Sequence, residues 1–274
     1  MDKVETTPGD LRITIVQSQL HWENKDANLE MFDNLLSGLS EKTDLIVLPE
    51  MFSTGFTMNT KALAEPTPGL TMEWMKQKAV EIDAAITGSI IAEEEGKHFN
   101  RLLWVNPDGS WEKYDKRHLF TMVGEDQYFT AGTERLVVEY KGWKILPLVC
   151  YDLRFPIWAR NRNQSDGQPE FDVIIYVANW PEVRKQPWNK LLQARAIENQ
   201  AFVIAANRVG KDMKDITYSG DSAVIDPYGE YLAEGEPGKE QLIHSTISYQ
   251  TLIDFRKKFP VLNDGDEFGL NRFL

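Results

Sequence analysis

Short apolar segments rich in β-branched residues alternate along the chain with segments in which apolar residues recur at helical spacing. Residues 11–19 (LRITIVQSQ) and 44–50 (DLIVLPE) are typical of buried strands, and Pro49 stops the second one. The apolar residues of segment 26–39 share one face of a helix: Leu29, Phe32, Leu35, Leu36 and Leu39. We expect Asp26 to cap this helix. The alternation predicts βα units.

The same alternation continues through the middle of the chain. Residues 71–82 (TMEWMKQKAVEI) predict a second helix, and residues 84–94 (AAITGSIIAEE) predict a strand. Further on, residues 171–180 (FDVIIYVANW) predict another strand. They lead into a helix over 187–200 that has Pro187 in its first turn.

Hairpin patterns interrupt the βα units. Residues 100–120 and 136–150 each place a turn signal between two apolar runs, at Asp108-Gly109 and Lys141-Gly142. The remaining expected elements are strands in 201–210 and 218–235 and a terminal helix at 249–258. Such a mixture of βα units and hairpins predicts an α/β fold with one mixed sheet or with two sheets packed together.

Length and composition limit the possible classes of protein. A chain of 274 residues fits one large α/β domain or two ordinary ones, and no linker-like run or internal repeat divides it. We therefore expect one domain over residues 1–274. With 42% hydrophobic and 26% charged residues, the chain can bury a full core. Its net charge of −12 argues against a nucleic-acid binder.

The single cysteine and the absence of long apolar runs indicate where the protein resides. One thiol cannot form an internal disulfide, so an oxidising compartment is not implied. The first residues contain no secretory signal pattern, and no window approaches 18 uninterrupted apolar residues. We therefore expect a cytoplasmic protein without a membrane span.

Three expected strands end at a chemically reactive side chain. Glu50 ends LIVLPE, Lys116 follows the first hairpin in YDKRHLF, and Cys150 ends ILPLVC. In α/β sheets, ligands bind outside the strand ends. A thiol can act as nucleophile, a carboxylate as base, and an ammonium group as a partner for developing negative charge. Each residue also has an ordinary interpretation, because a lone Cys is commonly a buried apolar residue and strand-end charges are commonly solvated.

The order of three short motifs favours the chemical interpretation. VLPEMF, YDKRHLF and CYDLRFP follow one another in the chain and resemble the three signature segments of the nitrilase superfamily of carbon–nitrogen hydrolases. The resemblance extends from ITIVQSQL through VANWP and ARAIENQAFVIAANRVG to GDSAVIDPYGE, so it covers nearly the whole chain. Within the superfamily it is closest to the omega-amidase branch, which hydrolyses the side-chain amide of 2-oxo acids such as 2-oxoglutaramate and 2-oxosuccinamate.

The resemblance implies a fold and a set of catalytic residues. The implied fold is a four-layer αββα sandwich, in which two mixed β-sheets are flanked by helices, and the implied assembly is a homodimer or a higher homo-oligomer. The catalytic glutamate, lysine and nucleophilic cysteine correspond to Glu50, Lys116 and Cys150. A second glutamate, which orients the site, corresponds best to Glu125, although Asp126 is adjacent and a surface-loop carboxylate is the alternative. No metal or cofactor is expected, because the four histidines are far apart in sequence.

The expected reaction is hydrolysis of the amide bond of a small linear amide through a thioester on Cys150, with release of ammonia. We expect the backbone N–H of Tyr151 to help Lys116 stabilise the oxyanion. Arg154 and Arg117 are candidates for binding a substrate carboxylate. The candidate pocket walls are Asn179, Trp180, Phe120 and Phe56.

Other functions remain open at this point. An aliphatic amidase, a carbamoylase or a nitrilase would carry the same three residues. A catalytically inactive binding partner is a further alternative, although such a protein would be expected to lack part of the Glu50, Lys116 and Cys150 set. A thiol-redox role for Cys150 would need a partner thiol from another molecule, because the chain has no second cysteine.

Overall fold

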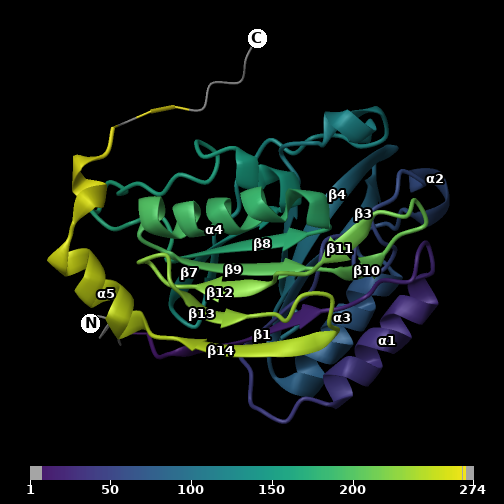
Figure 1. Cartoon of the computed structure of the whole chain (residues 1–274), viewed down its shortest axis with the longest axis horizontal. Coiled ribbons are helices and arrows are strands. Elements are labelled where there is room, and N and C mark those ends of the chain that lie inside the picture. Colours follow the sequence, from purple (N-terminus) through teal and green to yellow (C-terminus); the bar gives the residue numbers. More distant parts are fainter. Residues whose placement is uncertain (1–7, 267, 270–274) are drawn as a thin grey trace.

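The computed structural model describes residues 8–266, 268 and 269. It contains two six-stranded β-sheets with helices on their outer faces (Figure 1). The first sheet has the strand order β14-β1-β2-β3-β4-β5. Its strands are β1 (Leu11–Gln17), β2 (Leu45–Val47), β3 (Ala85–Glu94), β4 (Lys97–Val105), β5 (Trp111–Asp115) and β14 (Gln241–Ile247).

The second sheet has the strand order β13-β12-β9-β8-β7-β6. Its strands are β6 (Val138–Tyr140), β7 (Trp143–Val149), β8 (Val173–Ala178), β9 (Phe202–Asn207), β12 (Ala223–Ile225) and β13 (Tyr231–Glu234). A separate two-stranded hairpin is made by β10 (Val209–Lys211) and β11 (Thr217–Ser219).

Both sheets have the same pattern of strand pairing. In the first sheet β1, β2 and β3 are parallel, and antiparallel strands flank them. In the second sheet β7, β8 and β9 are the parallel strands, again flanked by antiparallel ones. The carboxyl ends of parallel strands meet at one edge of a sheet, which is where a site on a rigid scaffold can form.

Helices cover the outer face of each sheet. The helices are α1 (Lys25–Ser37), α2 (Thr60–Leu63), α3 (Leu70–Ile82), α4 (Lys185–Asn199) and α5 (Tyr249–Lys258). Helices α1 and α3 pack on the first sheet through Phe32, Met72 and Met75. Helix α4 lies on the opposite side of the molecule and packs on the second sheet (Figure 1). The layers are therefore helix, sheet, sheet and helix, as expected from the sequence.

The largest apolar core lies between the two sheets and continues beneath α4. Side chains of the first sheet such as Ile13 and Leu102 share this cluster with Ile145 and Ile175 of the second sheet. Trp143 is fully buried there. Burying apolar side chains of this size contributes about 1.5–3 kcal/mol each, so the interface between the sheets fixes their relative position.

Two details of the fold differ from the sequence-based expectations. The side chain of Asn24, not Asp26, caps α1, because its Oδ1 accepts a hydrogen bond from the backbone N–H of Ala27. Strand β14 was not expected. Its residues are mostly half-exposed, so their pattern is weak, and the strand exists because it pairs along its whole length with β1.

Within the described residues, no helix is both long and apolar enough to cross a membrane.

Candidate active site

Lys116 lies between two buried carboxylates. Its Nζ is 2.9 Å from Oε1 of Glu50 and 3.0 and 2.9 Å from Oε1 and Oε2 of Glu125. All three side chains are at most 1% exposed. Glu50 follows β2, Lys116 follows β5, and Glu125 begins the short 3-10 helix η2 (Glu125–Gln127). Asp126 is exposed, so Glu125 is the carboxylate that reaches Lys116.

Asn100 of β4 is hydrogen-bonded to both carboxylates. Its Nδ2 is 2.7 Å from Oε1 of Glu50 and 3.2 Å from Oε1 of Glu125, and its Oδ1 accepts a hydrogen bond from Ser89. The sequence analysis did not identify Asn100 as a site residue. The only sequence signal was a polar residue at the start of an apolar strand, and such residues are usually hydrogen-bonded when buried.

Cys150 begins a sharp turn at the carboxyl end of β7. Its φ of +45° lies in the left-handed region, which non-glycine residues rarely adopt. The turn continues as the 3-10 helix η3 (Cys150–Arg154). Strained backbone of this kind persists only where the surrounding structure holds it, and it is frequent at reactive residues.

The surroundings of Cys150 set its protonation. Burial and the nearby charge of Glu50 raise the pKa of the Cys150 thiol well above its ordinary value, whereas the charge of Lys116 opposes the rise. Burial lowers the pKa of Lys116, but the carboxylates of Glu125 and Glu50 overcome this effect and raise it overall. Burial also raises the pKa of Glu125. The thiol is therefore protonated at neutral pH and needs a base before it can attack.

Asn179 connects Glu50 to the second sheet. Its backbone N–H donates to Oε2 of Glu50 at 2.9 Å, and its Nδ2 donates to the backbone carbonyl of Glu50 at 2.5 Å. Asn179 lines the cavity at Cys150. Its Oδ1 atom is buried and accepts no hydrogen bond from any described residue.

Asp152 holds the turn of Cys150 against the segment of Lys116. It accepts hydrogen bonds from the backbone N–H of Val149 and of His118, from Nδ1 of His118, and from the phenol of Tyr114. Because Val149 precedes the turn while Tyr114 and His118 flank Lys116, the Asp152 carboxylate fixes the two segments relative to each other.

A small cavity of about 110 Å³ opens at Cys150. Its buried lining includes Lys116, Asn179, Trp180 and Tyr218, and Phe56, Phe120, Tyr151 and Arg154 also line it. Of the residues that the sequence analysis proposed around the substrate, all but Arg117 line this cavity: Phe56, Phe120, Tyr151, Arg154, Asn179 and Trp180.

The two candidate arginines are placed differently. The guanidinium of Arg154 lies 4.9 Å from the centre of the Trp180 ring, inside the cavity lining. Arg117 is not part of that lining, because its Nη1 donates to the carbonyl of Gly132 and its guanidinium lies over Trp158. The side chain of Arg117 thus packs against Gly132 and Trp158 and does not point toward the cavity at Cys150.

The β10–β11 hairpin supplies cavity residues that the sequence did not predict. Asp212, Lys214, Ile216 and Tyr218 line the cavity from this side. The Asp212 carboxylate is already bound by the backbone N–H groups of Lys214 and Ile216 and by the phenol of Tyr218. No local motif marks these residues, because only the placement of the hairpin brings them to the site.

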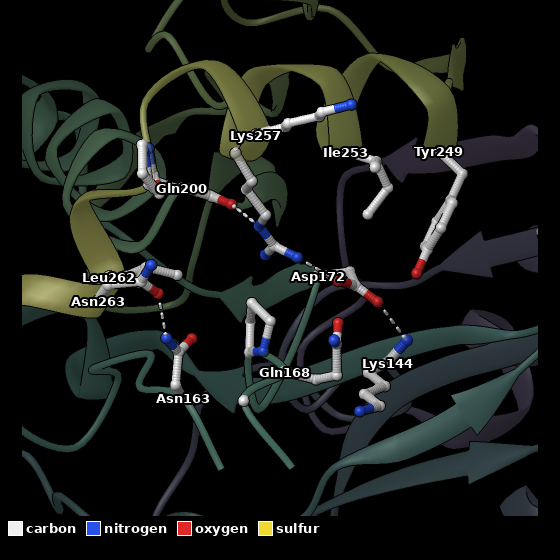
Figure 2. A pocket seen from close by; sticks show the side chains of 14 residues that line it. Lys144, Asn163, Gln168, Asp172, Gln200, Tyr249, Ile253, Lys257, Leu262 and Asn263 are labelled. Atoms are coloured by element: carbon white, nitrogen blue, oxygen red, sulfur yellow. Dashed lines mark hydrogen bonds and ion pairs between the residues drawn. The ribbon is translucent and has the colours of Figure 1, made fainter. Parts of the chain in front are cut away.

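A larger cavity of about 310 Å³ lies apart from this cluster, beneath α5 (Figure 2). Its lining includes Lys144, Asp172, Gln200 and Tyr249 but none of the residues that line the cavity at Cys150. Arg256 of α5 crosses it to contact Asp172 at 2.6 Å and the carbonyl of Gln200 at 2.9 Å. These bonds fasten α5 to the second sheet.

In residues 8–266, 268 and 269, no group of three or more His, Cys, Asp or Glu side chains is arranged to hold a metal ion.

Comparisons with known proteins agree with this geometry. Residues 12–257 match the family model described as carbon-nitrogen hydrolase. The chain is 46% identical to the omega-amidase YafV of Yersinia enterocolitica, over 95% of this chain and 98% of the relative. It is 33% identical to the 2-oxoglutaramate amidase of Bacillus subtilis, over 92% of this chain and 96% of the relative.

A solved structure has the same fold. XC1258 from Xanthomonas campestris, a CN-hydrolase superfamily protein with an arsenic adduct in its active site, superimposes with a TM-score of 0.92. The two sequences are 47% identical, and the match covers 96% of this chain and 99% of the other.

Proposed function

The chain belongs to the carbon–nitrogen hydrolase family, and we propose that its substrate is the ω-amide of a 2-oxo dicarboxylic acid, such as 2-oxoglutaramate or 2-oxosuccinamate. As a member of this family it hydrolyses a carbon–nitrogen bond of a linear amide. The observation that carries the substrate proposal is the cluster of buried Glu50 and Lys116 beside the half-buried Cys150, in a chain 46% identical to omega-amidases.

In the proposed acylation step, Glu50 removes the proton of the Cys150 thiol as the sulfur attacks the amide carbon. The negative charge that develops on the amide oxygen is stabilised by Nζ of Lys116 and by the backbone N–H of Tyr151. Losing one such donor commonly lowers the rate by about 10²–10³-fold. Glu50 then gives its proton to the departing nitrogen, so ammonia leaves and a thioester remains on Cys150.

In the deacylation step, Glu50 takes a proton from a water molecule as the water attacks the thioester carbon. The carbon–sulfur bond breaks, the sulfur receives the proton back, and the carboxylic acid is released. The same carboxylate therefore acts first as base and then as acid in each half of the cycle. The raised pKa of the thiol supports this role, because few thiolates exist before the base acts.

Glu125 is proposed as a positioning residue. It contacts Lys116 with both oxygens, and its Oε2 accepts the backbone N–H of Phe120 at 2.6 Å. Together with Asn100 it fixes the direction of the Lys116 ammonium group. An ammonium group held in advance stabilises a developing charge without further reorganisation.

The substrate is proposed to lie in the small cavity, with its amide end and its carboxylate end contacting different residues. Asn179, which lines the cavity and is hydrogen-bonded to Glu50, is a suitable contact for the scissile amide. Arg154, supported on Trp180, is a suitable partner for the free carboxylate. Phe120 and Tyr151, whose ring centres are 4.9 Å apart, would contact the carbon chain between these ends.

A homodimer and a cytoplasmic location belong to the same proposal. The exposed apolar side chains Ile157, Val183 and Ile197 lie on or near helix α4 and support an interface there. A thiol nucleophile functions in a reducing compartment, which supports the cytoplasm. Light scattering during size-exclusion chromatography would measure the mass of the assembly, and a monomeric mass would contradict the dimer.

The deciding experiment measures ammonia released from 2-oxoglutaramate by the wild type and by Cys150→Ser. The intact mass of each protein is recorded in a rapidly quenched reaction. We expect turnover and an acyl mass increment in the wild type and neither in the variant. Full activity of Cys150→Ser would refute the mechanism. If the wild type does not hydrolyse 2-oxoglutaramate but does hydrolyse other amides or nitriles, the mechanism stands and only the proposed substrate is refuted.

A further inference from the structure

We propose that Arg184 is a second carboxylate-binding residue, which acts with Arg154 to select amides of 2-oxo acids over amides without a carboxylate. This inference rests on the proposed function and names the side chain that gives it specificity. Arg184 ends the 3-10 helix η4 (Glu182–Arg184), directly before α4. It lines the same cavity as Cys150 and Arg154.

Arg184 is held on an aromatic surface, as Arg154 is. Its guanidinium lies 5.5 Å from the centre of the Phe120 ring, and its Nη2 lies 3.3 Å from Sδ of Met122. Arg154 lies over Trp180 in the same manner. A guanidinium that rests its face on a ring keeps its N–H edge available for an anion.

Neither arginine has an oxygen acceptor among the described residues, and the one partner of this edge is the weakly accepting Sδ of Met122 on Arg184. Among the described residues, six arginines contact a carboxylate: Arg12, Arg101, Arg135, Arg162, Arg195 and Arg256. Three others donate to backbone carbonyls, namely Arg117, Arg160 and Arg208. Arg154 and Arg184 do neither, although the chain has 42 acidic and only 30 basic residues.

The charges of the cavity lining together favour an anion. Arg154, Arg184 and Lys214 add three cations to that of Lys116, whereas Asp212 is the one carboxylate in the lining. A 2-oxo acid presents two carboxylate oxygens and an adjacent carbonyl oxygen in one plane, and all three accept hydrogen bonds from guanidinium groups.

A merely structural role would have a different signature. The contact with Met122 links Arg184 to the 3-10 helix η1 (Thr121–Val123), which precedes Glu125. If Arg184 only held this segment, its loss would slow the chemical step for every amide. A specificity role predicts a loss that is larger for substrates with a carboxylate and that falls mainly on KM.

The test compares kcat/KM for 2-oxoglutaramate and for the neutral amide pentanamide in four proteins: wild type, Arg184→Gln, Arg184→Lys and Lys190→Gln. Lys190 is an exposed residue of α4 and controls for the change in net charge. We expect Arg184→Gln to lower the ratio of the two values by about 10- to 100-fold. Arg184→Lys should restore part of the ratio, and Lys190→Gln should leave it unchanged.

A second measurement needs no turnover. 2-Oxoglutarate should protect Cys150 from iodoacetamide, and its half-protecting concentration should rise at least tenfold in Arg184→Gln. An unchanged ratio, or unchanged protection, would overturn the role of Arg184. If the wild type is inactive on 2-oxoglutaramate but another carboxylate-bearing amide shows the dependence on Arg184, only the proposed substrate is refuted. Inactivity on all such amides would overturn both proposals.

Discussion

The phenol of Tyr114 donates a hydrogen bond of 2.8 Å to Oδ2 of Asp152, and this bond joins the two β-sheets beside the active site. Tyr114 lies in β5, two residues before Lys116. Asp152 lies in the turn after β7, two residues after Cys150. The bond thus sets the distance between the lysine and the cysteine.

Replacing Tyr114 by phenylalanine should lower both stability and catalysis. The change removes one donor from the buried Asp152 carboxylate, which should cost about 1–2 kcal/mol in the free energy of unfolding. It also loosens the placement of Lys116 relative to Cys150, so kcat should fall by about 10-fold or more. Urea unfolding and steady-state kinetics measure the two effects.

Tyr140→Phe is the matched control, because Tyr140 is also buried and donates to a backbone carbonyl, that of Asp44, away from the site. It should reduce stability by a similar amount and leave kcat/KM near the wild-type value. Equal losses of activity in both variants would show that Tyr114 acts only through overall stability.

Glu125→Gln should strongly reduce activity. The carboxylate accepts hydrogen bonds from Lys116, Asn100 and the backbone of Phe120, and an amide has one oxygen for these donors. Its NH₂ group would face Lys116 or Phe120, so we expect kcat to fall by about 10²-fold. The equivalent replacement of a carboxylate by an amide at the neighbouring exposed residue, Asp126→Asn, should have little effect on kcat. Comparable losses at both positions would contradict the role of Glu125.

The reaction of Cys150 with iodoacetamide should keep accelerating above neutral pH. Because burial raises the pKa of this thiol, the thiolate fraction should still be increasing at pH 9, about tenfold for each pH unit. An ordinary thiol levels off near its pKa of about 8.5. The mass increment is unambiguous, since the chain has one cysteine. Lys116→Met should slow alkylation further, because the lysine charge lowers the pKa of Cys150. A plateau below pH 8 would contradict the prediction.

The Asp44 carboxylate should increase the free energy of unfolding at neutral pH and lose this effect in acid. It accepts hydrogen bonds from the backbone and side chain of Arg12 and from Lys141, and the Arg12 guanidinium holds its pKa well below the usual range. A lowered pKa gives stability that is complete above the unfolded pKa of about 4 and is lost as the pH falls below it.

Asp44→Asn should therefore lower the free energy of unfolding by about 2 kcal/mol at pH 7. This difference from the wild type should shrink between pH 5 and pH 3. Urea unfolding across this range measures it, with the exposed Asp126→Asn as a control of equal charge change. A difference that does not depend on pH would show that the lost bonds, and not the carboxylate charge, account for the effect.

The sequence predicted the elements whose signals are local. The long apolar runs ended where the strands end, so Glu50 and Cys150 were placed at the carboxyl ends of β2 and β7. Lys141 and Gly142 both have positive φ, as a two-residue hairpin turn requires. The terminal helix 249–258 coincides with α5. Arg195 and Glu198 form an ion pair of 2.8 Å, as their spacing of three residues on one helix face predicts.

The features that the sequence did not predict depend on distant partners. Asn100 belongs to the site because β4 pairs with β5 and brings the Asn100 amide within hydrogen-bonding distance of Glu50. Tyr218 belongs to it because the β10–β11 hairpin lines the cavity. Arg117 and Arg154 could not be ranked from sequence, since both follow strand ends. Only the packing of Arg117 on Trp158 directs it away.

The equivalent strand pairing of the two sheets divides the proposed catalytic residues between two layers. The middle parallel strands end at Glu50 in one sheet and at Asn179 in the other, and these residues bind each other. The proposed base comes from the first layer, whereas the thiol comes from the second. A chain that has folded only one layer has either a base without a nucleophile or a nucleophile without a base. Hydrolysis can therefore begin only after the two layers have docked, and recovery of activity during refolding would time that docking event.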